Sequence, residues 1–580
     1  MRKKLGDRYT RAVDVEEVLL DASNMLSLNQ GRLEGKRERP IKQASVRTVG
    51  FIFSVVSVVF FYHIFTLQVV KGTEYQKISE NNTVSKVVIV AERGVVYDRK
   101  GEMLAWNETD PKGVYDFPIR AYTDGLGLGQ VLGYVSYPKK DGKGFFYRTE
   151  YLGRSGVELA YDTTLKGENG NKVVEVDALG HQVSKYEINL PKNGQDLHLS
   201  IDAGLSEAIY QIIASSTKES GARSGAAAIM DVETGEIIAL TSFPSYDPEV
   251  MADGDDVNKI NEYNKDTRLP FLNKVVGGAY TPGSIVKPFV AYAGLKEGVI
   301  SSATHIYSNG KLTIPNPYTP SQPSYFADWR AQGDMTVREG LAFSSNVFFY
   351  VVGGGLPQIA LPQAGFDHPV PGVGITKLDS YFDYFNFGHK TNIKMSSEQE
   401  GTVPSPDWKK KQFGDDWRLG DTYFTSIGQY GWQVTPIQML VAYGALANGG
   451  RFFTPHLVSS EKPEYVDKPL DPNILKVIHE GMRMTTTHPR GTAQALKKPY
   501  VDIAAKSGTA ELDFAKARLN TWAAGYWPYE RPRYAFILMM ENAPYTNRLG
   551  GTKVMGNIMD WIHINRPEYL EATASSETTQ

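Results

Sequence analysis

A serine followed three residues later by a lysine opens an apolar stretch near the middle of the chain. The stretch is GGAYTPGSIVKPFV, residues 277–290, and it contains Ser284 and Lys287. Serine is a weak nucleophile and needs a base within hydrogen-bond reach. Residues three apart on a helix share a face, and burial of a lysine lowers its pKa and frees its amine to accept a proton. The pair therefore predicts nucleophilic catalysis, provided that a helix begins near Gly283.

Two other interpretations of this stretch compete with catalysis. The Gly-x4-Gly spacing of residues 278–283 resembles a phosphate loop, but the Lys-Ser/Thr that must follow is absent. Ser284 is also suited to being an ordinary helix N-cap beside a solvated lysine. The Ser-x-x-Lys spacing recurs at Ser215 and Ser459, on a polar helix end and in a surface-like loop. Spacing alone therefore does not decide.

A second segment supplies polar residues in an apolar setting. The run LAFSSNVFFYVV places Ser344 and Asn346 among Leu, Phe and Val. Buried polar side chains need hydrogen-bond partners, so this Ser-x-Asn indicates a polar site nearby. A locally satisfied serine in an apolar helix remains the alternative.

A third segment, AAKSGTAEL, has the pattern of a strand that binds an anionic peptide. It contains the only Lys-Ser/Thr-Gly in the chain. A glycine within a strand permits close backbone approach by a ligand, the lysine suits an anionic group, and an edge strand can pair with an extended peptide. A plain turn at a strand end is the alternative. The residues concerned are Lys506, Ser507, Gly508 and Thr509.

The elements that must position these residues predict an α+β fold. Strand patterns with a central E-T-G turn lie at SGAAAIMDVETGEIIALTSFP, after a helical pattern that ends at Gly221. Helical and loop segments follow to about residue 495, and three strand patterns then return. Helices bracketed by two sets of strands predict an antiparallel sheet covered by helices. Nearer the N-terminus, turn residues 98–101 predict a hairpin.

Residues 49–70 predict a membrane-spanning helix. They contain no Asp, Glu, Lys or Arg and are long enough to cross a bilayer. A cleaved signal peptide fits poorly because a long segment precedes these residues and no A-x-A site follows. Six basic residues lie between Arg32 and Arg47, so the positive-inside rule predicts a cytoplasmic N-terminus and an extracytoplasmic remainder.

Composition excludes several classes of protein. The chain of 580 residues exceeds what one core accommodates, so two or more domains are expected. A net charge of −3 gives no case for a nucleic-acid partner. The chain has no cysteine, which excludes disulfides and thiol catalysis, and its ten histidines have no ligand-like spacing. We expect neither a metal nor a cofactor.

Taken in order, S-x-x-K, S-x-N and K-S-G form the motif set of penicillin-binding proteins and serine β-lactamases. The chain resembles a class B penicillin-binding protein, a monofunctional peptidoglycan transpeptidase. The segments RGVVYDRKGEMLA, GVELAYDTTLKGENG, LTSFPSYDPE, IGQYGWQVTPIQM and ANGGRFFTPHLV extend the resemblance over nearly the whole region after the membrane. Residues 326–350 are closest to the elongation-type penicillin-binding protein 2. Two positions depart from the pattern, since Tyr430 and Asn392 stand where glycine is usual.

The resemblance implies roles for the site residues. Ser284 would attack the carbonyl between two terminal D-alanines and become acylated, with Lys287 as the base. Ser344 would relay a proton to the leaving amine, and Asn346 would orient Lys287 and the substrate amide. The substrate carboxylate would be held by Lys506 and Ser507, within the substrate-binding segment that also includes Gly508 and Thr509. The backbone N–H groups of Ser284 and Thr509 would form the oxyanion hole.

The resemblance also implies a domain order, a location and partners. We expect a cytoplasmic tail at 1–47, a membrane helix at 48–70, a strand-rich pedestal at 71–194, a transpeptidase domain at 195–568 and a disordered tail at 569–580. The protein would lie in the cytoplasmic membrane, act on peptidoglycan stem peptides and be acylated by β-lactams. A polytopic SEDS-type glycosyltransferase would be its partner. A D,D-carboxypeptidase or β-lactamase, and a catalytically silent scaffold or β-lactam sensor, remain alternatives.

Overall fold

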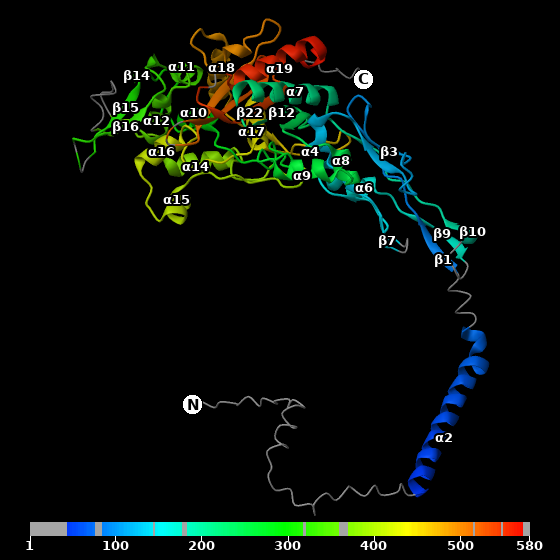
Figure 1. Ribbon diagram of the computed structural model, residues 1–580. Helices are drawn as coiled ribbons and strands as arrows, with labels where there is room; N and C mark the ends of the chain where they lie inside the picture. Colours follow the sequence, from blue (N-terminus) through cyan, green and yellow to red (C-terminus); the bar gives the residue numbers. More distant parts are fainter. Residues whose placement is uncertain are drawn as a thin grey trace, which may run out of the picture. The chain divides into compact units, whose positions relative to one another are not determined.

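The computed structural model describes residues 43–75, 84–142, 146–176, 182–316, 319, 321–358, 369–513, 515, 517–546 and 549–571 (Figure 1). Most of the predicted N-terminal tail and the last nine residues lie outside this set. The chain forms two units, one with residues 1–85 and 175–184 and the other with residues 86–174 and 185–580.

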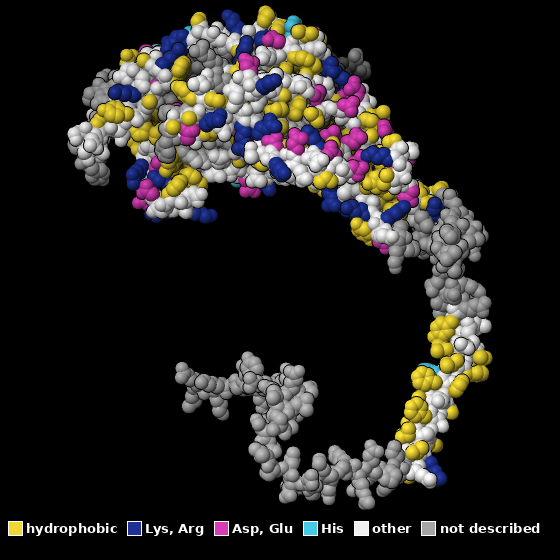
Figure 2. Space-filling model, in the orientation of Figure 1, with side chains coloured by type: hydrophobic (Ala, Val, Ile, Leu, Met, Phe, Trp, Pro, Cys, Tyr) yellow, Lys and Arg dark blue, Asp and Glu magenta, His cyan; other side chains and the backbone are white. Residues whose placement is uncertain are grey.

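The first unit contains an apolar helix that is long enough to span a membrane. Helix α2 (Gln43–Phe65) continues as a π-helical turn, η1 (Thr66–Val70). Its most apolar window has a mean hydropathy of 2.0, and none of that window is buried against other parts of the chain. Figure 2 shows hydrophobic side chains along this helix. A helix with apolar side chains exposed all round needs a surrounding of lipid, in agreement with the predicted membrane segment.

The second unit begins with short strands and helices. The hairpin predicted at residues 98–101 is confirmed, because β2 (Val96–Tyr97) and β3 (Met103–Glu108) pair antiparallel around it. The Asp98 carboxylate accepts hydrogen bonds from the backbone N–H groups of Lys100 and Glu102, which fixes the turn. The sheet order is β11-β2-β3-β4, with β4 at Ile119–Tyr122 and β11 at Leu197–His198.

The remaining elements before residue 200 are small. A three-stranded sheet has the order β1-β9-β10, and two strand pairs, β5-β8 and β6-β7, accompany it. The bounds are β1 (Val84–Ile89), η2 (Leu126–Leu128), α4 (Gly129–Leu132), β5 (Val135–Ser136), β6 (Lys139–Lys140), β7 (Phe146–Arg148), β8 (Leu152–Gly153), α5 (Gly156–Ala160), α6 (Asp162–Leu165), β9 (Gly170–Val176) and β10 (Gln182–Asn189).

A buried ion cluster holds this first part of the second unit together. Glu158 in α5 accepts hydrogen bonds from Arg93 Nε at 2.5 Å and from Arg120 Nε at 2.8 Å, and Arg93 also pairs with Asp162 at 2.8 Å. Burial alone would raise the pKa of Glu158, but Arg120 and Arg93 hold that pKa below its usual value. The Arg-Gly of the segment RGVVYDRKGEMLA therefore has a structural role through Arg93.

The predicted antiparallel sheet forms the centre of the second unit, with the strand order β13-β12-β22-β21-β20. The strands are β12 (Ser224–Asp231), β13 (Ile237–Phe243), β20 (Ala504–Glu511), β21 (Arg518–Trp527) and β22 (Tyr534–Pro544). Successive residues of β12 enter two different hydrophobic cores, Ala226, Ala228 and Met230 one core and Ala227 and Ile229 the other. This alternation is the period-two pattern of a sheet covered on both faces.

Helices from separate parts of the sequence cover the two faces. Helices α7 (Ala203–Ser220) and α19 (Gly551–Asn565) pack on one core, and α10 (Lys287–Lys296) and α17 (Pro436–Asn448) pack on the other (Figure 1). Helix α7 ends at Gly221 in a left-handed cap, as predicted. The α+β fold class is thereby confirmed.

The other helices and strands of this unit connect and flank the sheet. They are α8 (Pro248–Asp253), α9 (Val257–Lys265), η3 (Gly283–Val286), β14 (Ile306–Ser308), β15 (Lys311–Ile314), β16 (Ser324–Ala327), β17 (Gly333–Met335), α11 (Val337–Ala342), α12 (Asn346–Gly354), α14 (Ile375–Tyr384), α15 (Pro406–Phe413), α16 (Leu419–Thr425), β18 (Arg451–Phe453), β19 (Tyr465–Asp467), α18 (Pro472–Thr487), η5 (Gln494–Leu496) and η6 (Pro567–Tyr569).

The predicted C-terminal tail begins too early in the sequence. Tyr569 is buried, its hydroxyl donates to Asp202 Oδ2 at 3.0 Å, and its carbonyl accepts from Trp527 Nε1 at 2.8 Å. The prediction missed this because the polar composition of the last residues gives no sign of one anchoring aromatic ring. The tail from residue 572 onward lies outside the described residues.

Candidate active site

A tight turn presents Ser284 at the start of a helix, as the sequence predicted. Gly283 has φ +57°, and its N–H donates to the carbonyl of Gly428 at 3.0 Å. A Cβ at Gly283 would lie 2.5 Å from the carbonyl oxygen of Thr509, so only glycine fits this crossing. Ser284 then lies in η3, where its N–H has no carbonyl partner within the helix. The hydroxyl of Ser284 makes no hydrogen bond to another residue in the described part of the chain.

Lys287 begins α10 and is completely buried. Its Nζ donates to the carbonyl of Ser344 at 2.8 Å, to the hydroxyl of Ser344 at 3.4 Å and to Oδ1 of Asn346 at 2.8 Å. All three acceptors are neutral. Burial lowers the pKa of Lys287 to about 7, although the carboxylate of Asp328 opposes the shift. Near neutral pH a large share of this amine is therefore unprotonated.

Ser344 lies in a strained turn between α11 and α12, and Asn346 is the first residue of α12. Ser344 has φ +54°, a conformation that residues other than glycine rarely adopt. Such strain persists only where the surroundings hold it, and it occurs often at functional sites. The turn directs both side chains toward Lys287, whose amine bonds to each of them. The two segments that the sequence predicted to share a polar site are thus in contact.

Asp328 anchors this turn from outside it. Its carboxylate accepts hydrogen bonds from the backbone N–H of Asn346 at 2.9 Å and of Val347 at 3.3 Å. The hydroxyls of Ser345 and Ser308 donate to the same carboxylate at 2.5 and 3.0 Å. An acidic side chain at a helix N-terminus is stabilised by the unpaired N–H groups and by the helix dipole. Asp328 therefore fixes where α12 begins.

Lys506 extends the network from the edge strand β20. Its Nζ donates to the hydroxyl of Ser344 at 2.7 Å and to the carbonyl of Ser507 at 2.9 Å. Burial and the nearby charge of Lys287 lower the pKa of Lys506 well below its usual value. Ser344 Oγ thus lies within hydrogen-bond distance of both lysine amines.

Gly508 allows the edge strand to lie directly against the serine turn. A Cβ at this position would meet Ile285 Cγ2 at 2.8 Å and the carbonyl oxygen of Pro282 at 3.0 Å. This close approach is made by the chain's own Ser284 turn, and Gly508 also lines the cavity. The approach of a ligand to this glycine stays a prediction. On either side of Gly508, Thr509 is exposed, and Ser507 Oγ lies 2.6 Å from the hydroxyl of Thr492.

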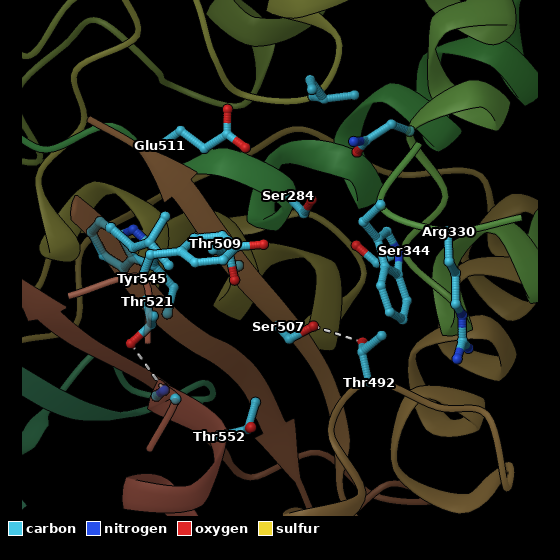
Figure 3. Close-up of a pocket in the computed structure, with 18 of the residues that line it drawn as sticks. Ser284, Arg330, Ser344, Thr492, Ser507, Thr509, Glu511, Thr521, Tyr545 and Thr552 are labelled. Atoms are coloured by element: carbon cyan, nitrogen blue, oxygen red, sulfur yellow. Dashed lines mark hydrogen bonds between the residues drawn. The ribbon is translucent and has the colours of Figure 1, made fainter. Parts of the chain in front are cut away.

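A cavity of about 1550 Å³ lies over these groups. Its wall includes most of the predicted site residues, namely Ser284, Ser344, Asn346, Ser507, Gly508 and Thr509. Figure 3 shows Ser284, Ser344, Ser507 and Thr509 around one hollow, with Glu511 at one end and Arg330 at the other. Lys287 and Lys506 do not line the cavity. Both amines lie within hydrogen-bond distance of the hydroxyl of Ser344, which does line it. A hydroxyl that lines a cavity and has buried amines nearby is suited to nucleophilic attack.

Sequence reasoning missed Asp328, Thr492 and the two cavity arginines, Arg330 and Arg490. None of them belongs to the three motifs S-x-x-K, S-x-N and K-S-G, and the role of each depends on residues that are distant in sequence. Among the described residues, no group of His, Cys, Asp or Glu side chains has the geometry to hold a metal ion.

The two departures from the family pattern have a common structural basis. Tyr430 has φ +64° and Asn392 has φ +63°, so both adopt the left-handed conformation that favours glycine. Asparagine tolerates this conformation. Tyr430 is packed between the rings of Trp408 and Trp417, at centroid distances of 5.9 and 5.7 Å. Within the described part of the chain, neither side chain forms a hydrogen bond with a residue of the catalytic motifs.

Two family models match the chain. A family model for the penicillin binding protein transpeptidase domain matches residues 225–560, and one for the penicillin-binding protein dimerisation domain matches residues 112–199. The peptidoglycan D,D-transpeptidase MrdA of Escherichia coli (strain K12) is 28% identical, with 90% of this chain and 94% of that protein covered.

Solved structures of PBP2 proteins are also similar to this chain. The PBP2 of Pseudomonas aeruginosa in complex with WCK 5153 superimposes with a TM-score of 0.68 at 27% identity, covering 85% of this chain and 99% of the other. The PBP2 of Helicobacter pylori in its complex with MreC gives a TM-score of 0.67 at 25% identity, covering 83% and 99%.

Proposed function

Because the chain belongs to the penicillin-binding protein transpeptidase family, we propose that it is a peptidoglycan D,D-transpeptidase of the penicillin-binding protein 2 type. It crosslinks stem peptides during cell-wall synthesis and is inhibited by β-lactams. The observation that carries the proposal is the burial of Lys287 one helical turn from Ser284, among neutral hydrogen-bond acceptors.

The first step of the proposed mechanism acylates Ser284. Lys287 accepts the hydroxyl proton as Ser284 Oγ attacks the carbonyl between the two terminal D-alanines. Hydrogen bonds between a nucleophile and its base often tighten only when substrate binds, which accounts for the unpaired Ser284 hydroxyl. The N–H groups of Ser284 and Thr509 bind the oxyanion, and each such donor contributes about 3–4 kcal/mol to transition-state stabilisation.

Ser344 passes a proton to the leaving amine. Its hydroxyl is within hydrogen-bond distance of the amines of both Lys287 and Lys506, so a proton can move between them through one oxygen. Asn346 orients Lys287 through its Oδ1, and its amide group extends toward the cavity to meet the substrate amide. The terminal carboxylate contacts Ser507, and its negative charge favours the protonated form of Lys506, which attracts it from behind the strand.

An amine from a neighbouring stem peptide then resolves the acyl-enzyme and forms the crosslink. Water in place of the amine would give a D,D-carboxypeptidase or β-lactamase of the same acyl-serine type. A catalytically silent scaffold or β-lactam sensor is the remaining alternative, and the intact hydrogen-bond network of the motifs favours catalysis over it.

The proposed location is the cytoplasmic membrane, with the N-terminus cytoplasmic and the catalytic domain outside. The apolar helix α2 is long enough for a single membrane passage. The basic residues before it support this orientation. We assign the pedestal to residues 71–194 and the transpeptidase domain to residues 195–568, with a SEDS-type glycosyltransferase as partner. Because the PBP2 of Helicobacter pylori forms a complex with MreC, a protein of that kind is a second proposed partner.

Labelling of the purified full-length protein with a fluorescent penicillin tests the proposal. We expect the wild type to acquire a covalent label and Ser284→Ala to remain unlabelled. An unlabelled wild type would refute the acyl-serine mechanism, and a labelled alanine variant would move the nucleophile elsewhere. Product analysis with an added amine then distinguishes transfer from hydrolysis.

A further inference from the structure

Two arginines lie side by side on the wall of the active-site cavity. Arg330 lies between β16 and β17, and Arg490 lies between α18 and η5. Nη2 of Arg330 donates to the carbonyl of Arg490 at 3.4 Å. Partial burial and the neighbouring charge of Arg490 lower the pKa of Arg330. The chain thus holds two like charges together at an exposed surface, which has an electrostatic cost.

Buried and aromatic groups fix the orientation of both guanidinium groups. Gln332 is buried, and its Oε1 accepts from Arg330 Nε at 3.3 Å and from Arg490 Nη2 at 3.0 Å. Nη2 of Arg490 also donates to the carbonyl of Gln332 at 2.8 Å. Each guanidinium lies over a ring, Arg330 over Trp329 at 4.2 Å and Arg490 over Phe343 at 4.1 Å. Two planar donors held in this way are prepared to bind an anion.

Among the residues that the structure describes, no acidic side chain pairs with the guanidinium group of Arg330 or Arg490. Asp328 attracts Arg330 without pairing with it, since its oxygens accept from the turn before α12. Lys409, by contrast, is paired with both Asp421 at 2.6 Å and Asp415 at 3.3 Å. The missing counter-charge therefore indicates an anionic ligand.

The position of the pair in the cavity identifies which substrate brings that anion. Under the proposed function, the donor peptide lies along β20 with its terminal carboxylate at Ser507, and its preceding residues extend toward Glu511. Figure 3 shows Arg330 at the other end of the cavity, beyond Ser344 and Thr492. That end is where the D-alanine leaves. An incoming amine takes the place of the leaving amine, so the acceptor peptide enters there.

We propose that Arg330 and Arg490 form the acceptor subsite and bind a carboxylate of the incoming peptide, an inference that rests on the proposed function. The acceptor nitrogen attacks the acyl carbon, the new C–N bond forms, and the bond from that carbon to Ser284 Oγ breaks. The proton lost by the amine goes to Ser284 Oγ. Binding of the acceptor carboxylate favours this transfer over hydrolysis of the same ester, because it holds the amine in position.

The ratio of transfer to hydrolysis tests the proposal. Full-length protein in detergent is given a D-alanyl thioester donor with either D-alanylglycine or D-alanylglycinamide as the acceptor. The carboxylate of the dipeptide lies about one residue, roughly 3.5 Å, beyond that of D-alanine and so reaches toward the arginines. Both products arise from one acyl-enzyme, so their ratio is independent of how fast it forms.

We expect the wild type to prefer D-alanylglycine over its amide by about tenfold, the value of a charge-assisted hydrogen bond at a partly exposed site. In Arg330→Gln/Arg490→Gln this preference falls to about one, and Arg330→Lys/Arg490→Lys keeps an intermediate preference because charge remains without the planar fork. The control Lys311→Gln removes another cation that stacks on a ring, over Tyr325 at 4.5 Å, and keeps the preference of the wild type.

Two results would overturn the proposal. The first is a wild type without preference between the two acceptors, and the second is a preference that survives in the double glutamine variant. Failure of the wild type to form any acyl-enzyme would refute the proposed function first and this inference with it. Acyl-enzyme formation without acceptor preference would refute the inference alone.

Discussion

Two groups of buried basic residues in this protein differ in whether a carboxylate lies beside them. The cations Arg93 and Arg120 share the carboxylate of Glu158, at 2.5 and 2.8 Å. At the active site, Lys287 and Lys506 are equally buried but bond only to hydroxyl, carbonyl and amide oxygens. Where a counter-charge is supplied, the charged form survives burial and the group is structural. Where it is absent, burial lowers the pKa of the lysine, which suits Lys287 to the proposed role of a base.

The comparison predicts its largest effect at Lys287. Replacement of the base by Lys287→Met should lower the rate of labelling by fluorescent penicillin by about 10³-fold, within the usual range for loss of a general base. Lys274→Met is a matched control. Lys274 is also buried, with a pKa lowered to about 8, but its Nζ donates to the carbonyl of Leu269 and it does not line the cavity.

The control keeps the wild-type labelling rate per folded molecule if position beside Ser284 is what matters. Equal losses in both variants would show that any buried lysine supports the fold and that Lys287 has no special role. Circular dichroism of both variants checks that the protein is folded.

Disruption of the buried ion cluster around Glu158 should lower the stability of the protein and leave its reaction with penicillin unchanged. Glu158→Gln leaves two buried guanidinium groups without their shared carboxylate, and breaking such a cluster costs about 3–5 kcal/mol. We expect a clearly lower midpoint of thermal unfolding, followed by tryptophan fluorescence, with labelling per folded molecule unchanged. A thermal midpoint equal to that of the wild type would contradict the structural role of this cluster.

A smaller effect is expected at Asp328, a buried carboxylate that acts on the structure of the site and on the pKa of Lys287. Its carboxylate fixes the turn of Ser344 and Asn346 and also raises the pKa of Lys287. Asp328→Asn should lower the labelling rate about tenfold, as expected for the loss of a charge-assisted hydrogen bond. The acid limb of the pH–rate profile should also move to lower pH, because Lys287 loses the charge that favours its protonated form.

The shift in pH distinguishes a positioning residue from one that only stabilises the fold. Asp334→Asn serves as the control, because Asp334 is exposed and pairs with His305 instead. A rate loss in Asp328→Asn with an unmoved pH limb would mean that Asp328 does not act through Lys287.

The sequence allowed the convergence of the site residues to be predicted, because the proposed catalytic residues form short motifs with fixed spacing. Ser284, Lys287, Ser344, Asn346 and the segment from Lys506 to Thr509 all converge. The central hairpin followed from its strand patterns and its E-T-G turn, and helix α7 from its periodicity and its glycine cap. Motifs, strand patterns, helical periodicity and caps each depend on residues close together in the sequence, so they can be recognised without a structure.

The supporting residues were not predictable, since their roles depend on contacts between distant segments. Asp328 is one acidic residue in a loop until five donors are seen to surround it. The contact of Gly508 with the Ser284 turn was likewise not visible in the sequence. Tyr569 shows the same limit at the C-terminus, where one buried ring ends the fold inside a polar segment.

Burial without a counter-charge makes Lys287 a base near neutral pH, and the proposed chemistry depends on this property. The most direct test is the second-order rate constant for acylation by benzylpenicillin, measured on the wild type from pH 5 to pH 10. We predict a rate that rises with pH through an apparent midpoint near 7, the pKa of Lys287. A midpoint near 10.5, the value for a solvated lysine, or a rate that does not change over this range, would contradict the role of Lys287 as the base.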